Sequence, residues 1–288
     1  MTVFAVTGLG EVRVDIQMGR AEVLATTRDD ISVSVQPSNP RRAGDRSAAE
    51  AVRVEQIGQT VVVTGPFRMN LFGPGDSIDV VVEVPEASVA DVEVKYGSAR
   101  LTGALGPVRA IVAYGDLTVD RAERLEVKGG HGEFRIGRVS GDADFTFKSG
   151  SARLTHVGGC LRIKGSDGPI VVDSVAGAVD AVTSSGAMEF GTLSSGATMR
   201  SAYGAVRVRD IVRGEVRVDG SYGSVDVGVR QGTAVWVDAT AQHGVVRTDL
   251  AADAGPVEGE DTVELRIRTG YGSIAIHRSD TRASEEKS

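Results

Sequence analysis

The stretches SGSARL at residues 149–154, DGPIVV at 167–172, SGAMEF at 185–190 and YGAVRV at 203–208 are four versions of one short recurring pattern. Each version has a glycine in its second position, and apolar residues stand two and four positions after that glycine. The residue between these apolar positions is charged in three of the four versions. Such alternation is typical of a β-strand with one buried and one solvent-facing side. The pattern therefore predicts short strands that begin just after a glycine corner.

The same pattern extends over most of the chain. Its anchor glycines are Gly97, Gly115, Gly132, Gly150, Gly168, Gly186, Gly204, Gly223, Gly244 and Gly272. Their spacing stays close to eighteen as far as Gly223 and then lengthens. Apolar residues also recur seven and five positions before the glycine, as at Leu161 and Ile163, and about seven positions after it, as at Val175. A unit this short cannot bury its apolar side alone, so successive units must stack. We expect an all-β fold, a single-chain β-solenoid (β-helix) with coils of about 18 residues, each rising about 4.8 Å.

Residues 1–85 form an irregular N-terminal β portion. The segments in this part are strand-like but do not keep the register of the repeat. They are either early coils or a sheet that caps the solenoid, because an open end would expose unpaired backbone groups. Within this part, residues 36–50 are polar and are predicted to form a mobile loop.

Residues 86–278 contain the solenoid repeats. Near their end, residues 251–261 are predicted to be an inserted loop and residues 263–277 a last coil. The tail at 279–288, SDTRASEEKS, is polar and is expected to be disordered.

Composition and charge exclude several classes of protein. Lys and Arg number 32 and Asp and Glu number 39, and the resulting net charge of −7 is a poor match for the phosphates of nucleic acid. The single cysteine, Cys160, excludes an internal disulfide, and the spacing of Cys and His fits no zinc finger. No apolar run is long enough for a transmembrane segment, and the N-terminus lacks the features of a signal peptide. We expect a soluble cytoplasmic protein, and peripheral membrane contact has no support in the sequence.

The segment IDVVVEVP at residues 78–85 leads into repeats such as KYGSARLTGALGPV, KSGSARLTHVGG and TSSGAMEFGTLSSGA. This succession resembles the bacterial putative-adhesin family of unknown function, also called the toastrack domain. The resemblance covers at least residues 78–277 and implies a β-solenoid with no assigned catalytic residues. By analogy it also implies a role in bacterial envelope stress or as an assembly scaffold. The length of the coil is similar to that of the bactofilin cytoskeletal polymers, which makes self-assembly a further hypothesis.

Aromatic residues often stand directly before the anchor glycine. The tyrosines at this position are Tyr96, Tyr114, Tyr203, Tyr222 and Tyr271. Stacking of the coils would align them into ladders, with Tyr96 next to Tyr114 and Tyr203 next to Tyr222. Such a ladder could stack on sugar rings or dock a partner strand, or it could only cover the corner of the coil.

Two acidic residues are candidates for a catalytic pair. Asp116 and Glu133 occupy the same coil position in neighbouring coils, at a spacing close to the separation of about 5 Å used by retaining glycosidases. Arg100 and Arg135 are close enough to neutralise them, and no long loop forms a pocket there. Chance proximity of outward-facing side chains is therefore the preferred interpretation.

The remaining reactive residues suggest no chemistry. His131 and His243 share the corner position but are six coils apart, so they cannot bind one metal ion. Cys160 begins a strand and is expected to be a small buried hydrophobe rather than a nucleophile. We predict no catalytic residue, metal site or cofactor.

The loop between Pro66 and Pro74 is unusually apolar. It contains the large apolar residues Phe67, Met69, Leu71 and Phe72. These side chains either pack over a cap or form a contact surface for another subunit or a membrane.

The sequence thus favours a non-catalytic scaffold that acts by protein interaction or self-association. The alternatives are a monomeric regulatory module that binds a partner along one face, and a polysaccharide-binding or polysaccharide-cleaving protein.

Overall fold

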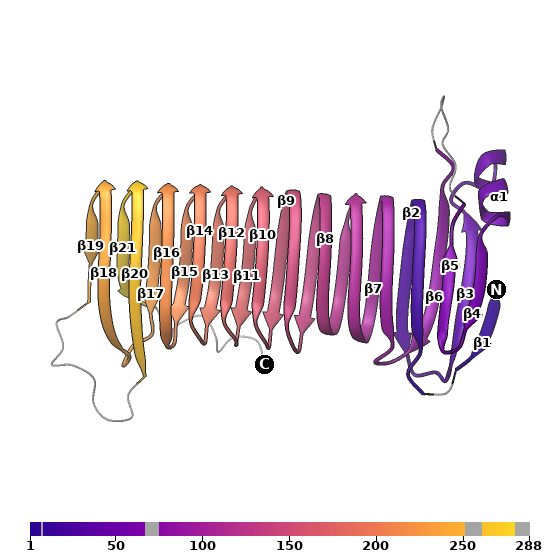
Figure 1. The fold of residues 1–288 in the computed structure, drawn as a ribbon, viewed down its shortest axis with the longest axis horizontal. Coiled ribbons are helices and arrows are strands. Elements are labelled where there is room, and N and C mark those ends of the chain that lie inside the picture. The colour runs from indigo at the N-terminus through magenta and orange to yellow at the C-terminus, as the bar shows by residue number, and fades with distance from the viewer. Residues whose placement is uncertain (7, 67–74, 251–260, 280–288) are drawn as a thin grey trace. The chain divides into compact units, whose positions relative to one another are not determined.

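A computed structural model describes residues 1–6, 8–66, 75–250 and 261–279. The chain forms two compact units, Met1–Lys148 and Ser149–Ser288. β-Strands make up most of both units (Figure 1).

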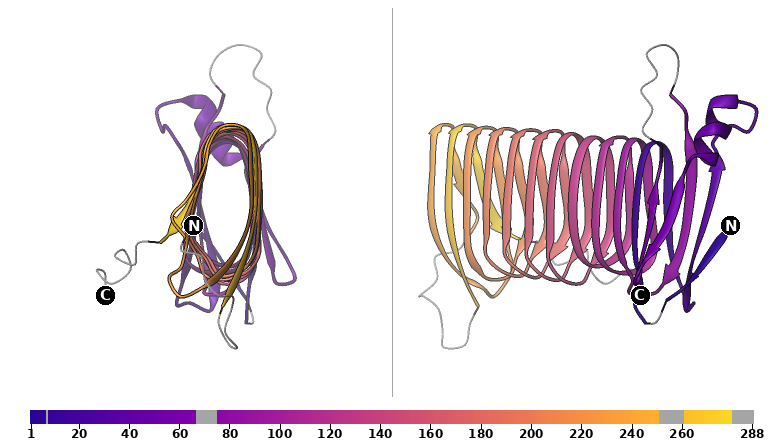
Figure 2. Two further views of the ribbon diagram at one scale, coloured as in Figure 1. Left: turned by 90° about the vertical axis from the view of Figure 1, so that its left-hand side faces the viewer. Right: turned by 45° about the vertical axis from the view of Figure 1, so that its right-hand side comes forward.

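The second unit is a stack of parallel coils. Its strands are β10 (Leu161–Asp167), β11 (Ile170–Val175), β12 (Val179–Ser185), β13 (Met188–Leu193), β14 (Ala197–Tyr203), β15 (Val206–Ile211), β16 (Gly214–Tyr222), β17 (Val225–Val229), β18 (Ala234–His243), β19 (Val246–Thr248), β20 (Thr262–Tyr271) and β21 (Ile274–Arg278). Each coil contains two strands, and each strand pairs with the equivalent strand of the next coil, as β10 does with β12. Leu161 lies opposite Val179, and Val179 lies opposite Ala197, which reproduces the period of the sequence repeat. The coils stack as flattened ovals (Figure 2).

The core of the second unit fills the inside of these coils. The apolar residues two and four positions after the corner glycine are buried, as Met188 and Phe190 show with 0% exposure. The apolar residue about seven positions after the corner glycine is also buried, for example Val175 and Leu193. The predicted β-solenoid and the period of its coils are confirmed.

The order of the coils at one end of the second unit differs from their order in the sequence. β20 pairs on one side with β16 and on the other with β18, while β21 lies between β17 and β19. The coil predicted to be last is therefore second to last in the stack, and the β18–β19 coil is terminal. The repeat pattern could not show this, because every coil carries the same apolar positions.

The C-terminal segment also differs from its prediction at one residue. Ser279 is predicted to belong to a disordered tail, but it is buried and donates its backbone N–H to the carbonyl of Val229 at 2.9 Å. Its hydroxyl donates to Asp210 at 2.8 Å. Residues 280–288 lie outside the described residues, as does the predicted inserted loop apart from Asp261.

The first unit combines coils with antiparallel strands. Its elements are β1 (Thr2–Ala5), β2 (Glu11–Thr26), β3 (Asp30–Pro37), α1 (Ala43–Glu50), β4 (Arg53–Ile57), β5 (Thr60–Thr64), β6 (Ile78–Pro85), β7 (Val89–Tyr114), β8 (Leu117–Val139) and the first residues of β9 (Ala143–Val157). β2 pairs in parallel with β7 on one side and with β5 and β6 on the other. Gly19 lies opposite Gly97, so β2 is a coil with its own corner glycine. The structure therefore contains an early coil in the N-terminal portion.

Antiparallel strands cover the outer edge of the β5–β6 coil. β4 pairs with β5, β3 pairs with β6, and β1 pairs with β3. The N-terminal portion thus also contains a capping sheet, so both arrangements left open by the sequence occur together.

The segment predicted to be a mobile polar loop contains the helix α1 instead. Within it, Asp45 is 1% exposed, and its carboxylate accepts the backbone N–H groups of Asn39 and Ser77 at 3.1 Å each. Ala48 is buried as well. A buried polar anchor rather than an apolar stripe holds this short helix in place, which is why periodicity does not reveal it. In the described part of the chain, no helix has the length and apolar character needed to cross a bilayer.

Candidate functional site

The glycine corners place the preceding residues in columns. Gly186 has φ +116°, and a Cβ at this position would lie only 2.2 Å from the carbonyl oxygen of Gly168 in the neighbouring coil. The N–H of Gly186 donates to the carbonyl of Tyr203 at 2.9 Å, and that of Gly204 donates to Tyr222 at 2.9 Å. These bonds fix the residue before each glycine directly above its counterpart. A side chain at this position therefore recurs along the stack at the spacing of the coils.

Four aromatic rings stack at this position in the second unit. The ring centroids of Tyr203 and Tyr222 are 5.1 Å apart, and those of Tyr222 and Tyr271 are 5.0 Å apart, with planes inclined by 6° and 2°. His243 stacks on Tyr271 at 4.4 Å. We call these four residues the tyrosine column. The predicted alignment of Tyr203 with Tyr222 is confirmed, and the changed coil order places Tyr271 rather than His243 next to Tyr222.

The tyrosine column exposes ring edges more than ring faces. Its three tyrosines are 47 to 60% exposed, but both faces of Tyr222 and Tyr271 are covered by neighbouring rings. Sugar stacking requires a free face. Among the described residues, the two end rings each keep one face that no ring covers: Tyr203 lies opposite Ser185, and His243 stacks only on Tyr271. The column is therefore better suited to an extended chain that contacts several ring edges in succession.

An open groove of about 380 Å³ lies beside the tyrosine column. Its lining residues are Asp219, Gly220, Ser221, Tyr222, Thr240, Gln242, Arg268, Thr269, Gly270 and Tyr271. Two tyrosines and several small or polar residues thus share one surface. Asp219 accepts a hydrogen bond from Arg217 at 2.8 Å, so its charge is partly compensated. The groove combines an aromatic side with hydrogen-bonding groups, a composition suited to contact with a peptide.

The first unit contains a shorter column of the same kind. Tyr96 stacks on Tyr114 at 5.2 Å and Tyr114 on His131 at 5.1 Å, both with planes inclined by 9°. Met18 lies opposite Tyr96 in the adjacent coil. The predicted alignment of Tyr96 with Tyr114 is confirmed as well.

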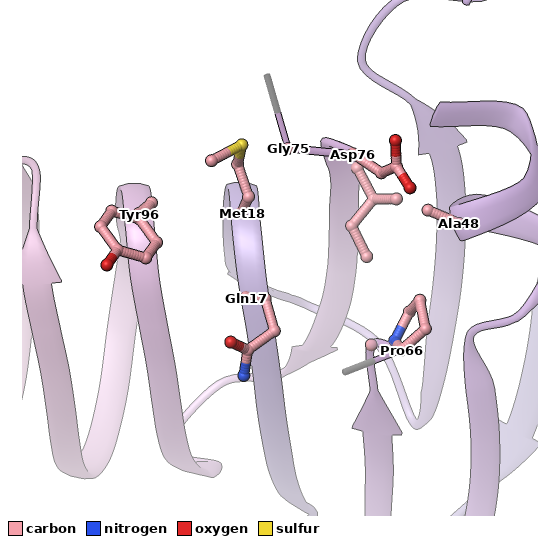
Figure 3. A pocket seen from close by; sticks show the side chains of 9 residues that line it. Gln17, Met18, Ala48, Pro66, Gly75, Asp76 and Tyr96 are labelled. Atoms are coloured by element: carbon pink, nitrogen blue, oxygen red, sulfur yellow. The ribbon is translucent and has the colours of Figure 1, made fainter. Parts of the chain in front are cut away.

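A small cavity lies at the end of this shorter column (Figure 3). Its volume is about 100 Å³, and its lining includes Met18, Tyr96, Ala48, Pro66 and Gly75. Ligand pockets usually measure about 300–1,000 Å³. The cavity is therefore smaller than a typical ligand pocket.

The apolar contact residues predicted from the sequence follow Pro66 and precede Gly75 in the chain. Phe67, Met69, Leu71 and Phe72 lie outside the described residues, so their burial or exposure stays a prediction.

The two residues of the candidate acidic pair make different contacts, and only Asp116 lines a groove. Asp116 accepts the backbone N–H of Glu133 at 2.9 Å, and Glu133 forms an ion pair with Arg135 at 2.5 Å. A groove of about 340 Å³ is lined by Asp116 but not by Glu133. The arrangement lacks the opposed acid and base that glycoside cleavage requires.

The histidines make separate local contacts. His131 and His243 are members of the two columns, His156 shares a hydrogen bond with Ser174 at 2.8 Å, and Nε2 of His277 lies 3.0 Å from Asp226. Across the described ranges, no group of three His, Cys, Asp or Glu side chains could hold a metal ion.

Cys160 is exposed, contrary to the prediction that it is buried. The inward alternation of β10 starts one residue later, at Leu161 and Ile163, so Cys160 has the opposite orientation.

Two charged groups outside the columns have shifted pKa values. A hydrogen bond from Lys128, whose Nζ lies 2.8 Å from the carboxylate, lowers the pKa of Glu126. Bonding to Glu264 raises the pKa of Arg266, whose guanidinium lies 5.9 Å from the ring centroid of Trp236. Both are surface ion pairs, and neither marks an acid or a base poised for catalysis.

Comparisons with known proteins point to a family rather than to an activity. No curated protein matches the chain. A structure of a putative adhesin from Bacteroides fragilis aligns over 96% of this chain and 95% of its own, with 9% identity and a TM-score of 0.37. A putative cell adhesion protein from Clostridium sporogenes aligns over 96% and 98%, with 10% identity and a TM-score of 0.21. Similarity this low supports no functional inference. The family model described as Toastrack DUF4097, however, matches residues 12–280, and the chain therefore belongs to the toastrack family.

Proposed function

We propose that this toastrack chain is a non-catalytic interaction scaffold that binds an extended segment of a partner protein along the tyrosine column. The observation that supports the proposal most directly is the half-exposed stack of Tyr203, Tyr222 and Tyr271 beside an open groove. Aromatic side chains with an exposed polar edge are enriched where proteins bind one another. The family resemblance links such a scaffold, by analogy, to bacterial envelope stress.

The stacking explains why the column can bind without being reorganised. Rings held between neighbours lose little conformational freedom on binding, because their orientation is already fixed by the coil register. Adjacent tyrosine rings are separated by 5.0 to 5.1 Å along the stack. A partner segment that lies along the stack would meet the edge of one ring after another.

Affinity capture with three variants tests the proposal. Tyr203→Ala with Tyr222→Ala should release the partner, whereas Tyr203→Phe with Tyr222→Phe keeps the stack and should weaken binding only by the loss of the hydroxyl groups. The matched control is Tyr96→Ala with Tyr114→Ala, which removes an equivalent stack from the first unit. Circular dichroism shows whether each variant keeps its fold.

A captured protein supports the proposal only after it has been purified and its affinity for all three variants has been measured by titration. Equal affinity of the wild-type chain and the Tyr203→Ala, Tyr222→Ala variant would contradict the proposal. A screen with glycans tests the polysaccharide alternative, and cleavage that depends on Asp116 and Glu133 would replace the scaffold proposal by an enzymatic one.

Self-association is the second candidate, and it is favoured by a separate observation. The β18–β19 coil of the second unit ends the stack with exposed apolar side chains, among them Trp236, Val237 and Val246. A second copy of the chain could cover these side chains, whereas the tyrosine column lies on the side of the coils.

A further inference from the structure

Among the described residues, no strand covers the outer edge of the β18–β19 coil, which we call the terminal coil. In the described residues β18 pairs only with β20, and β19 only with β21. Val237 lies opposite Leu265, and Val246 lies opposite Ile274. Leu265 and Ile274 are 0% exposed, whereas Val237 is 36% and Val246 is 40% exposed. Residues at core positions are thus left uncovered at this end.

Backbone groups at the terminal coil are uncovered in the same way. In the preceding coils, the residue two positions after the corner glycine donates its N–H to the next coil. Val225 donates to Ser273 at 3.0 Å, and Ile274 donates to Val245 at 3.0 Å. Val246 is the equivalent residue of the terminal coil, and no described residue accepts its N–H. The end of the stack is therefore an exposed strand edge with an apolar side, the arrangement on which another strand can pair.

The first unit shows how this chain covers such an edge. Strands β4 and β3 lie antiparallel on β5 and β6, with Val54 opposite Val63 and Val33 opposite Val82. Val63 and Val82 are both 0% exposed. An antiparallel strand is therefore a partner that satisfies the edge of a coil in this fold.

We infer that the terminal coil pairs with the terminal coil of a second copy of this chain, forming a two-fold symmetric dimer. This inference rests on the second candidate function, self-association, and deepens it by naming the surface and the symmetry. A two-fold axis across the end of the stack places each edge strand antiparallel to the same strand of the second copy. Each copy then supplies the covering strand that the other lacks.

The structure favours a closed dimer over a filament. Stacking of copies head to tail would require a second uncovered coil, but β5 and β6 already pair with β4 and β3, and the edges left without a partner among the described residues of the first unit belong to the short strands β4 and β1.

Light scattering during size-exclusion chromatography of the full chain tests the dimer. The expected mass is twice the chain mass of 30.0 kDa. Val237→Lys with Val246→Lys should raise the dimer Kd at least about 100-fold, because like charges would then face each other across the edge. Ile57→Lys is the matched control, since Ile57 is 65% exposed on a strand of the first unit. This control should remain dimeric.

A second variant and a second measurement keep the test decisive if the double lysine variant folds poorly. Val246→Pro removes the N–H that the second copy would use, and that N–H has no acceptor within the described protomer. Hydrogen exchange should show protection of residues 234–248 that grows with protein concentration in the wild-type chain and is absent in the Val246→Pro variant.

Each remaining outcome would overturn the inference. A wild-type monomer at every concentration would show that no second copy binds, and a segment of the same chain or another protein would then be the partner of this edge. Open-ended assemblies would contradict two-fold closure, and a dimer that survives both edge variants would place the interface elsewhere. The outcome of the capture experiment on Tyr203 and Tyr222 is independent, so failure of the lateral proposal and failure of the dimer are distinguishable.

Discussion

Replacing the corner glycine Gly186 by alanine should destabilise the second unit strongly. Gly186 has φ +116°, where a side chain is strained, at a cost of about 1–3 kcal/mol. The new Cβ would also lie 2.2 Å from the carbonyl oxygen of Gly168, so the two coils must separate, which adds about 1–3 kcal/mol. The lower freedom of alanine in the unfolded chain offsets about 0.4–1 kcal/mol. The expected net loss is about 1–6 kcal/mol.

Alanine substitutions at two other glycines of the same unit separate the cost of backbone strain from the cost of the close approach between coils. Gly232 has φ +79°, and no atom lies within 4 Å of the position that a Cβ would take there. Gly232→Ala should therefore show only backbone strain, about 1–2 kcal/mol. Gly220 lies outside the positive-φ region, and the nearest contact of a Cβ there would be Oγ1 of Thr269 at 3.5 Å. Gly220→Ala should raise the stability slightly, by about 0.4–1 kcal/mol, because only the lower freedom of alanine in the unfolded chain acts there.

Urea unfolding followed by far-ultraviolet circular dichroism measures all three free energies of unfolding. The fluorescence of the single tryptophan, Trp236, reports on the terminal coil in the same experiment. Equal losses of stability in Gly186→Ala and Gly232→Ala would show that the close approach between corners adds nothing, and the reasoning would be refuted.

Three further predictions concern the remaining features. Asp45→Ala should destabilise the first unit by about 1–3 kcal/mol, because the backbone N–H groups of Asn39 and Ser77 lose their bonds to a buried carboxylate. Thermal unfolding compared with Asp79→Ala, at a more exposed carboxylate, checks this. Because the folded-state pKa of Glu126 lies below its usual value, its small contribution to stability is present above about pH 4.5 and is lost as the pH falls through the folded pKa. Lys128→Gln should move the NMR titration of Glu126 upward, and an unchanged midpoint would show that another group causes the shift. Cys160 should react stoichiometrically with a thiol reagent in the folded chain, whereas slow reaction limited by unfolding would show that it is buried.

The coils could be predicted because their signal is local. Alternating apolar residues after a glycine identify a strand and its inward side within a few positions, as at Met188 and Phe190. The alignment of Tyr203 with Tyr222 follows from the same register. The close approach between the corner glycines could not be predicted in this way, because it depends on the adjacent coil and not on the sequence around one glycine.

The order of the coils could not be predicted, because it depends on which of several similar edges pair. Val246 has the same position in the repeat as Val225, yet it is exposed because its coil ends the stack. The long spacing between Gly244 and Gly272 indicates an insertion but not its direction. The stacking of Tyr271 on Tyr222 could not be predicted either, because it depends on the changed order of the coils.

The placement of the β20–β21 coil between its neighbours has a consequence for synthesis on the ribosome. The chain leaves the ribosome from its N-terminus, so the terminal coil emerges before the coil on which it must stack. Thirty residues separate Thr248 from Arg278, which corresponds to about 2 to 6 s of translation at about 5–20 residues per second. During this interval the valines of the terminal coil have no completed neighbour. The order in which the coils are made therefore differs from the order in which they stack, and the β18–β19 coil can take its final place only after the β20–β21 coil has been made.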